Sequence, residues 1–203
     1  EEAAADYYMT WLSTPAPWLD GAAPGAYFDR FADAGKLVAL LKAYIAAGTP
    51  VPDPLLNRLE DLRQEEPVLA LLRDSSAPAE ARMHAVELLR QWDSVAPMVD
   101  YLRWQVERGE DEELLDNALD SLRCMGDAVA RPAKTAFNAA DETGREALLD
   151  VLADFPGNED VFAFALSQFK ARPEKRALYA GYLGKIGDDR ALEALLDVAE
   201  SDD

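Results

Sequence analysis

The segment from residue 179 to residue 199 constrains the fold of this chain more than any other part of the sequence. Its apolar residues form two sets with helical spacings of three and four residues, and a glycine and two aspartates separate the sets. The sets are Tyr179, Leu183 and Ile186, followed by Leu192, Leu195 and Leu196. Such spacings place each set on one side of a helix, so the segment predicts a helical hairpin. Neither helix can bury its apolar face alone, and the unit therefore needs neighbouring copies.

The same register recurs upstream of this hairpin. Five residues that each end an apolar helix face lie 30, 33, 30 and 31 positions apart: Leu62, Trp92, Met125, Phe155 and Ile186. We expect helical pairs at about 53–74, 77–109, 111–140, 142–172 and 173–200. The periodicity predicts an all-α fold, a right-handed α-solenoid (an α-α superhelix) of about five pairs. Pro132 lies two positions later in its repeat than Pro67 and Pro97 do in theirs, which predicts irregular structure near residues 126–140.

Residues 1–52 differ from the repeats, and we interpret them as an N-terminal helical cap rich in aromatic residues. Many aromatic side chains lie in the first 31 positions: Tyr7, Tyr8, Trp11, Trp18, Tyr27, Phe28 and Phe31. Helices are expected at about residues 3–13, 24–34 and 36–47. The aromatic residues either cover the open apolar face of the first repeat or form a binding platform around Trp11 and Trp18.

Composition limits the classes of partner. Acidic residues outnumber basic ones 39 to 20, and the formal net charge of −19 repels phosphate backbones and anionic membrane surfaces. The second helices carry basic residues such as Arg103 and Arg131, but acidic residues such as Asp100 interleave with them. We therefore expect neither nucleic acid nor a membrane as a partner. The single cysteine, Cys124, excludes an internal disulfide, and a cytoplasmic location is expected.

Side chains for catalysis or metal binding are sparse. His84 is the only histidine, and Glu80 and Glu87 share its helix face. Three such ligands on one exposed helix bind a metal weakly without supporting residues, so we expect an ordinary solvated face. Cys124 has no histidine nearby in the sequence to act as a base and is interpreted as a small packing residue. No catalytic residue, metal or cofactor is therefore expected.

Apolar side chains beyond those that the repeats need point to a binding surface. The second helix of the fourth repeat carries more apolar residues than one side of a helix can hold. At least one of its phenylalanines is therefore expected to face outward or toward a neighbouring repeat. We hypothesise that a partner groove is lined by Asp100, Arg103, Trp104, Phe164 and Gln168. The alternative is that Trp104 and Phe164 complete the packing between repeats.

The segment Leu183–Leu196, which reads LGKIGDDRALEALL, resembles the repeats of HEAT-like proteins, particularly the bacterial type related to phycobilisome lyases. Weaker copies of the pattern occur at Leu122–Asp127 and Leu152–Asn158. The resemblance covers about residues 53–200. It implies a curved stack of antiparallel helix pairs that usually binds proteins and is an enzyme only in some branches.

We therefore predict a non-catalytic scaffold or adaptor that binds an unidentified protein partner through the concave surface of the solenoid, as a monomer or weak dimer. The alternative is a cofactor- or chromophore-handling protein similar to the phycobilin lyases, with a tetrapyrrole in the groove and lyase-like activity. A third interpretation is a domain within a larger regulatory protein.

Overall fold

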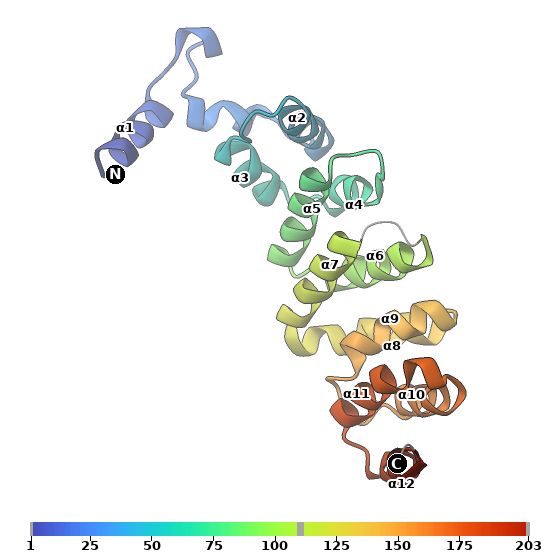
Figure 1. Ribbon diagram of the computed structural model, residues 1–203. Coiled ribbons are helices and arrows are strands. Elements are labelled where there is room, and N and C mark those ends of the chain that lie inside the picture. The colour runs from blue at the N-terminus through green and yellow to red at the C-terminus, as the bar shows by residue number, and fades with distance from the viewer. Residues whose placement is uncertain (1, 109–111, 202–203) are drawn as a thin grey trace. The chain divides into compact units, whose positions relative to one another are not determined.

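The computed structural model describes residues 2–108 and 112–201. Over those residues the chain forms α-helices and short 3-10 helices and no β-strand (Figure 1), which confirms the predicted all-α class. The chain divides into two compact units, one ending at Ser94 and the other beginning at Val95. The predicted boundary at residues 52 and 53 stays a prediction, and the predicted repeat boundary at 109 and 111 lies outside the described residues.

The first unit consists of helices separated by turns rich in proline and glycine. They are α1 (Glu2–Ser13), η1 (Pro17–Leu19), η2 (Pro24–Arg30), α2 (Ala34–Ala46), α3 (Asp53–Leu62), α4 (Glu65–Arg73) and α5 (Ala79–Gln91). Helix α2 begins after Asp33, whose carboxylate accepts a hydrogen bond from the backbone N–H of Gly35 at 2.9 Å. The helix predicted over 24–34 is instead the shorter η2, because the backbone becomes extended at Phe31 before this cap.

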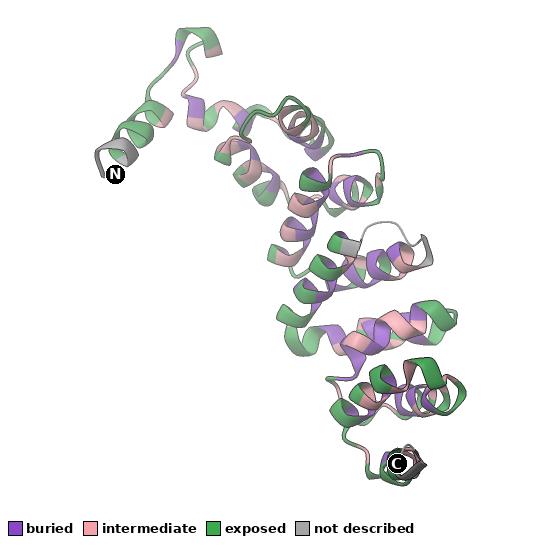
Figure 2. Cartoon of the chain, in the orientation of Figure 1, coloured by how far each residue is buried: buried purple, intermediate pink, exposed green. Residues whose placement is uncertain are grey.

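The core of the first unit lies among η2 and helices α2 to α5. Helix α3 packs against η2 and α2, and α4 packs against α2 and α5. The fully buried side chains include Leu37, Leu41, Leu55, Leu59, Val68, Leu72, Ala85 and Leu89. Phe28 is buried with them, whereas Trp11 and Trp18 are exposed, and Figure 2 shows exposed residues along α1. The N-terminal aromatic residues therefore divide between the core and the surface.

The second unit continues with helices of similar length. They are α6 (Val95–Arg108), α7 (Glu112–Cys124), η3 (Gly126–Val129), α8 (Ala130–Ala139), α9 (Glu142–Leu152), α10 (Glu159–Ala171), η4 (Pro173–Lys175), α11 (Arg176–Ile186), η5 (Asp189–Ala191) and α12 (Leu192–Ser201). Helix α6 packs against α7, α8 and α9, α8 packs against α9, and α10 packs against α11. Buried side chains at these contacts include Met98, Tyr101, Leu102, Leu114, Phe137, Leu148, Leu152 and Tyr179.

The irregularity predicted near residues 126–140 is confined to the 3-10 helix η3, because α8 is a regular α-helix over Ala130–Ala139. Gly126 adopts a φ of 61° and opens η3, which continues directly into α8. Cys124, at the end of α7, is exposed, so its interpretation as a packing residue is wrong. The buried side of α7 carries Ala118 and Leu122, and a residue two positions beyond Leu122 points away from that side.

The last predicted apolar face is only partly covered. Leu192 and Leu196 of α12 are 54% and 59% exposed, whereas Leu183 and Ile186 of α11 are buried. The spacing of the leucines therefore identified the helix but not the burial of its apolar side.

The packing of α6 can be tested by a pair of leucine substitutions. Leu102→Ala is expected to lower the free energy of unfolding by about 2–5 kcal/mol, because it leaves a cavity at a fully buried position. Leu196→Ala is the matched control at an exposed helical position and is expected to change stability by less than about 0.5 kcal/mol. Urea denaturation followed by circular dichroism measures both values. Equal losses in the two variants would contradict the described packing of α6.

Candidate functional site

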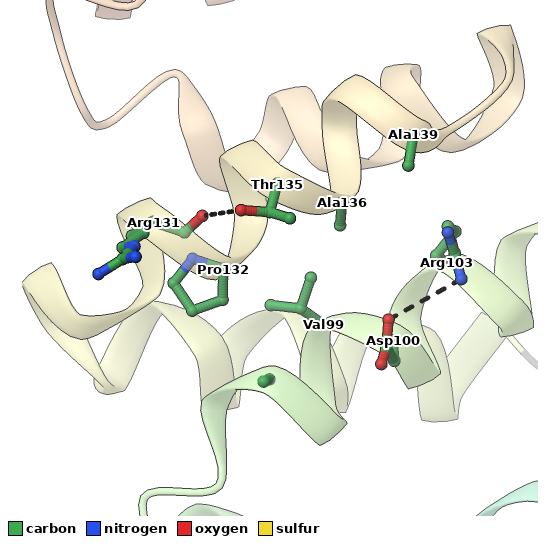
Figure 3. Close-up of a pocket in the computed structure, with 9 residues that line it drawn as sticks. Val99, Asp100, Arg103, Arg131, Pro132, Thr135, Ala136 and Ala139 are labelled. Carbon is green, nitrogen blue, oxygen red and sulfur yellow. Dashed lines mark hydrogen bonds and ion pairs between the residues drawn. The ribbon is translucent and has the colours of Figure 1, made fainter.

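A groove in the second unit lies between α6 and α8 (Figure 3), with a volume of about 370 Å³. The residues that line it are Ala96, Val99, Asp100 and Arg103 from α6, and Arg131, Pro132, Thr135, Ala136 and Ala139 from α8. On each helix these residues recur at spacings of three or four, so each helix contributes one side to the groove. Met98 and Leu102, on another side of α6, are buried in the core.

The floor of the groove is apolar. Val99 and Ala136 are almost fully buried, and their methyl groups face the space between the two helices (Figure 3). Along the groove Pro132 lies on the side of Val99, whereas Ala139 lies on the side of Arg103. Helices α6 and α8 therefore run in the same direction, side by side.

The two ends of the groove carry guanidinium groups. At one end, Nη2 of Arg103 lies 3.8 Å from Oδ1 of Asp100, and at the other end Arg131 is exposed. Between them, the hydroxyl of Thr135 donates a hydrogen bond to the carbonyl oxygen of Arg131 at 3.0 Å. Guanidinium groups present planar donors that match carboxylates. The groove therefore combines apolar surface with donors for acidic groups.

The structure brings only part of the predicted partner-binding set together. Asp100 and Arg103 line the groove, but Trp104 does not, and its ring packs at 6.0 Å from the ring of Tyr101. Arg103 and Arg131, two of the basic residues of the second helices, both line the groove.

The two predicted residues of α10 lie elsewhere in the second unit. The ring of Phe164 packs edge-on against Phe137 of α8, with centroids 5.5 Å apart. Phe164 therefore faces a neighbouring helix, one of the two orientations expected for the surplus phenylalanine. Gln168 is half-buried, and its Oε1 has no hydrogen-bond partner within the described residues.

Trp11 and Trp18 line a separate pocket in the first unit, with a volume of about 300 Å³. We call it the aromatic pocket. Its other lining residues are Tyr8, Leu12, Leu19, Pro24, Tyr27, Phe28, Tyr44, Pro52 and Pro54. The two tryptophans therefore belong to one concave surface built by α1, η1, η2, α2 and the start of α3.

Glu146 of α9 joins this helix to η4 and α11. Its carboxylate accepts hydrogen bonds from Nζ of Lys175 at 2.5 Å and from the hydroxyl of Tyr179 at 2.8 Å, and Arg172 lies 3.4 Å away. Burial raises the pKa of Glu146, but the hydrogen bonds from Lys175 and Tyr179 outweigh burial and hold the pKa below the ordinary value of 4.5. Burial and the nearby carboxylate raise the pKa of Tyr179.

His84 and Glu87 are half-buried, so the helix face that was expected to be solvated is only partly exposed. Glu87 from that face pairs with Arg90 at 2.5 Å. Within residues 2–108 and 112–201, no group of three or more His, Cys, Asp or Glu side chains is arranged to hold a metal ion. In the same part of the chain, no helix has both the length and the apolar character needed to cross a bilayer.

In comparisons with known proteins, no family model, curated protein or solved structure matches this chain.

The Glu146 contacts predict a pH-dependent contribution to stability. Because the pKa of Glu146 is lower in the folded chain than its ordinary value of 4.5, the ionised group stabilises the fold above that pH. This contribution is lost as the pH falls through the lowered folded-state pKa. Glu146→Gln is therefore expected to be less stable than the wild type at neutral pH, with a difference that shrinks as the pH falls below 4.5 and through the lowered pKa of Glu146.

Urea denaturation at several pH values measures this difference, and Glu174→Gln at an exposed position of η4 is the control. A destabilisation by Glu146→Gln that stays constant over the whole pH range would contradict the role assigned to the carboxylate.

Proposed function

We propose that this chain is a non-catalytic protein-binding scaffold built from stacked HEAT-like helical pairs. In this proposal the groove between α6 and α8 holds a segment of a partner protein. The observation that carries the proposal is the apolar floor of the groove between two guanidinium groups. Such a surface suits an apolar side chain flanked by carboxylates, because arginine and buried apolar anchors dominate the energetics of interfaces.

Side-chain contacts within each unit support the stacked arrangement. In a repeat stack each copy touches its neighbours, so contacts between copies recur at about the repeat length. Several hydrogen bonds between helices join residues 26 to 33 positions apart. They are Lys134 with Asp160 at 2.8 Å, Trp92 with Glu60 at 3.1 Å, Arg190 with Glu159 at 2.7 Å, and Tyr179 with Glu146 at 2.8 Å.

The direction of α6 and α8 also supports the stack. These helices are the second members of consecutive predicted pairs, and they run side by side in the same direction (Figure 3). Equivalent helices of consecutive pairs take this arrangement in an α-solenoid. Helix α6 also packs against α9, the first helix of the next predicted pair but one, which departs from strict nearest-neighbour stacking.

The stacked arrangement predicts an extended molecule. A compact domain of 203 residues has a radius of gyration of about 17 Å, and repeats added along one axis give a clearly larger value. Small-angle X-ray scattering in solution measures the radius of gyration directly. A value close to that of the compact domain would rule the stack out.

The binding role of the groove can be tested with two matched substitutions on α8. Thr135→Glu introduces a carboxylate into the groove, where it repels an acidic ligand and competes for the guanidinium groups. Asn138→Glu makes the same charge change at an exposed position that does not line the groove. Glutamate has a higher helix propensity than threonine or asparagine, so neither variant is expected to unfold. A random peptide library is selected against the wild-type chain, and the selected peptides are titrated against both variants.

We expect the selected peptides to share an apolar residue flanked by aspartate or glutamate. Thr135→Glu is expected to weaken their binding by about tenfold, whereas Asn138→Glu leaves it unchanged. Selection of no shared sequence, or equal binding by the two variants, would refute the role of the groove. A visible absorption band in protein purified from its source would instead favour the chromophore-handling alternative.

A further inference from the structure

Several aromatic rings in the first unit are left uncovered by the fold. Trp18, Trp11 and Tyr8 are 74%, 43% and 42% exposed, although each ring would bury a large apolar area in a core. They are gathered in the aromatic pocket together with Tyr44. Exposed apolar residues that form one contiguous surface mark a binding site, whereas scattered ones do not.

Backbone contacts hold the shape of the aromatic pocket. In the turn that carries Trp18, the N–H of Ala16 donates to the carbonyl of Ala22 at 3.0 Å, and the N–H of Gly21 donates to the carbonyl of Ala16 at 3.1 Å. Helix α1 lies so close to η2 that a Cβ added to Gly25 would lie 3.0 Å from the backbone oxygen of Leu12. The pocket is therefore formed before a ligand arrives, which reduces the entropy lost on binding.

The walls of the pocket fit a proline-rich segment. The rings of Tyr8 and Trp11 stack with centroids 6.0 Å apart, and the rings of Pro24, Pro52 and Pro54 extend the apolar surface. Grooves lined by aromatic residues bind segments in the polyproline II conformation, which is ordered before binding. The backbone of such a segment has no internal hydrogen bonds, so its carbonyl groups accept donors from a partner.

The pocket supplies donors for those carbonyl groups. Trp11 and Trp18 each carry an indole N–H, and Tyr8 and Tyr44 each carry a hydroxyl group. Within the described residues, these four donors make no hydrogen bond to another part of the chain. The rings thus offer apolar faces to proline and polar edges to the backbone of the same ligand.

Charge around the pocket selects the residues that flank the prolines. Asp20 follows the lining residue Leu19, Asp53 lies between two lining prolines, and both aspartates are exposed. None of the lining residues is lysine or arginine, and the whole chain carries a net charge of −19. The guanidinium of Arg30 lies 3.8 Å from the centroid of the Tyr27 ring, but Arg30 itself is not a lining residue. Exposed aspartates next to lining residues in the chain, together with the acidic net charge, favour a ligand with basic residues.

We propose that the aromatic pocket binds a proline-rich segment of another protein, in the polyproline II conformation and flanked by lysine or arginine. Its ligand is basic and rich in proline, whereas the groove between α6 and α8 suits an acidic segment. The pocket is therefore a second binding site of different specificity.

Isothermal titration calorimetry of the full chain tests this proposal. The probe is a synthetic peptide of about six prolines, two turns of the polyproline II helix, between paired arginines. We expect saturable binding with a dissociation constant below about 1 mM. Trp18→Ala is expected to weaken binding by about tenfold or more without lowering the thermal unfolding midpoint, because Trp18 is largely exposed.

Tyr7→Ala is the matched control, since Tyr7 is 76% exposed but does not line the pocket, and it is expected to leave the affinity unchanged. A peptide with alanine in place of proline, and one with glutamate in place of arginine, are both expected to bind at least about tenfold more weakly. The groove variant Thr135→Glu is expected to bind the proline peptide as tightly as the wild type, because Thr135 does not line the aromatic pocket.

Three outcomes would overturn the proposal. The first is no saturation by the proline peptide at about 1 mM. The second is an equal effect of Trp18→Ala and Tyr7→Ala. The third is tighter binding of a peptide that contains trimethyllysine and no proline than of the proline peptide. That result would identify the rings as a cage for quaternary ammonium groups.

Discussion

The structure depends on the burial of one apolar side of each helix against neighbouring helices. In α6, Met98, Tyr101 and Leu102 have no exposed surface or almost none, and their packing fixes the rotation of the helix about its own axis. That rotation turns Val99 and Arg103 toward α8, where they line the groove. The groove is therefore a consequence of core packing, because its α6 side cannot be repositioned without unpacking the residues between α7, α8 and α9.

Helical periodicity identified most helices because spacings of three and four residues persist wherever a helix has one buried side. It did not identify what covers each side. Leu192 and Leu196 show the same spacing as residues of α11, yet they are more than half exposed. At the N-terminus, the pattern indicated a helix over 24–34, but the extended backbone at Phe31 and the cap at Asp33 divide this stretch. Burial and helix ends depend on neighbours and on local capping, which apolar spacing does not encode.

The residues that line the two candidate sites were predictable where they share one helix and unpredictable where two elements must meet. Asp100 and Arg103 lie on one side of α6, so their proximity follows from helical geometry. Thr135 enters the same groove only through the parallel packing of α8 beside α6, which no local pattern specifies. Likewise, Tyr44 lies 33 positions after Trp11 and reaches the aromatic pocket through the packing of separate segments.

The two sites have opposite local charge within one acidic chain, so net charge alone does not decide their ligands. The groove presents Arg103 and Arg131, whereas Asp20 and Asp53 flank residues of the aromatic pocket. The electrostatic field of the whole chain acts while a ligand approaches, and salt at physiological concentration screens it over about 8 Å. Burial of apolar surface and hydrogen bonds act once the ligand is in contact. The proposal for the aromatic pocket therefore has a basic segment favoured both during its approach to the chain and in contact with the pocket. In the complex proposed for the groove, an acidic segment must overcome the electrostatic repulsion of the chain. Its affinity would therefore rest on the apolar floor and on the planar donors of the two arginines.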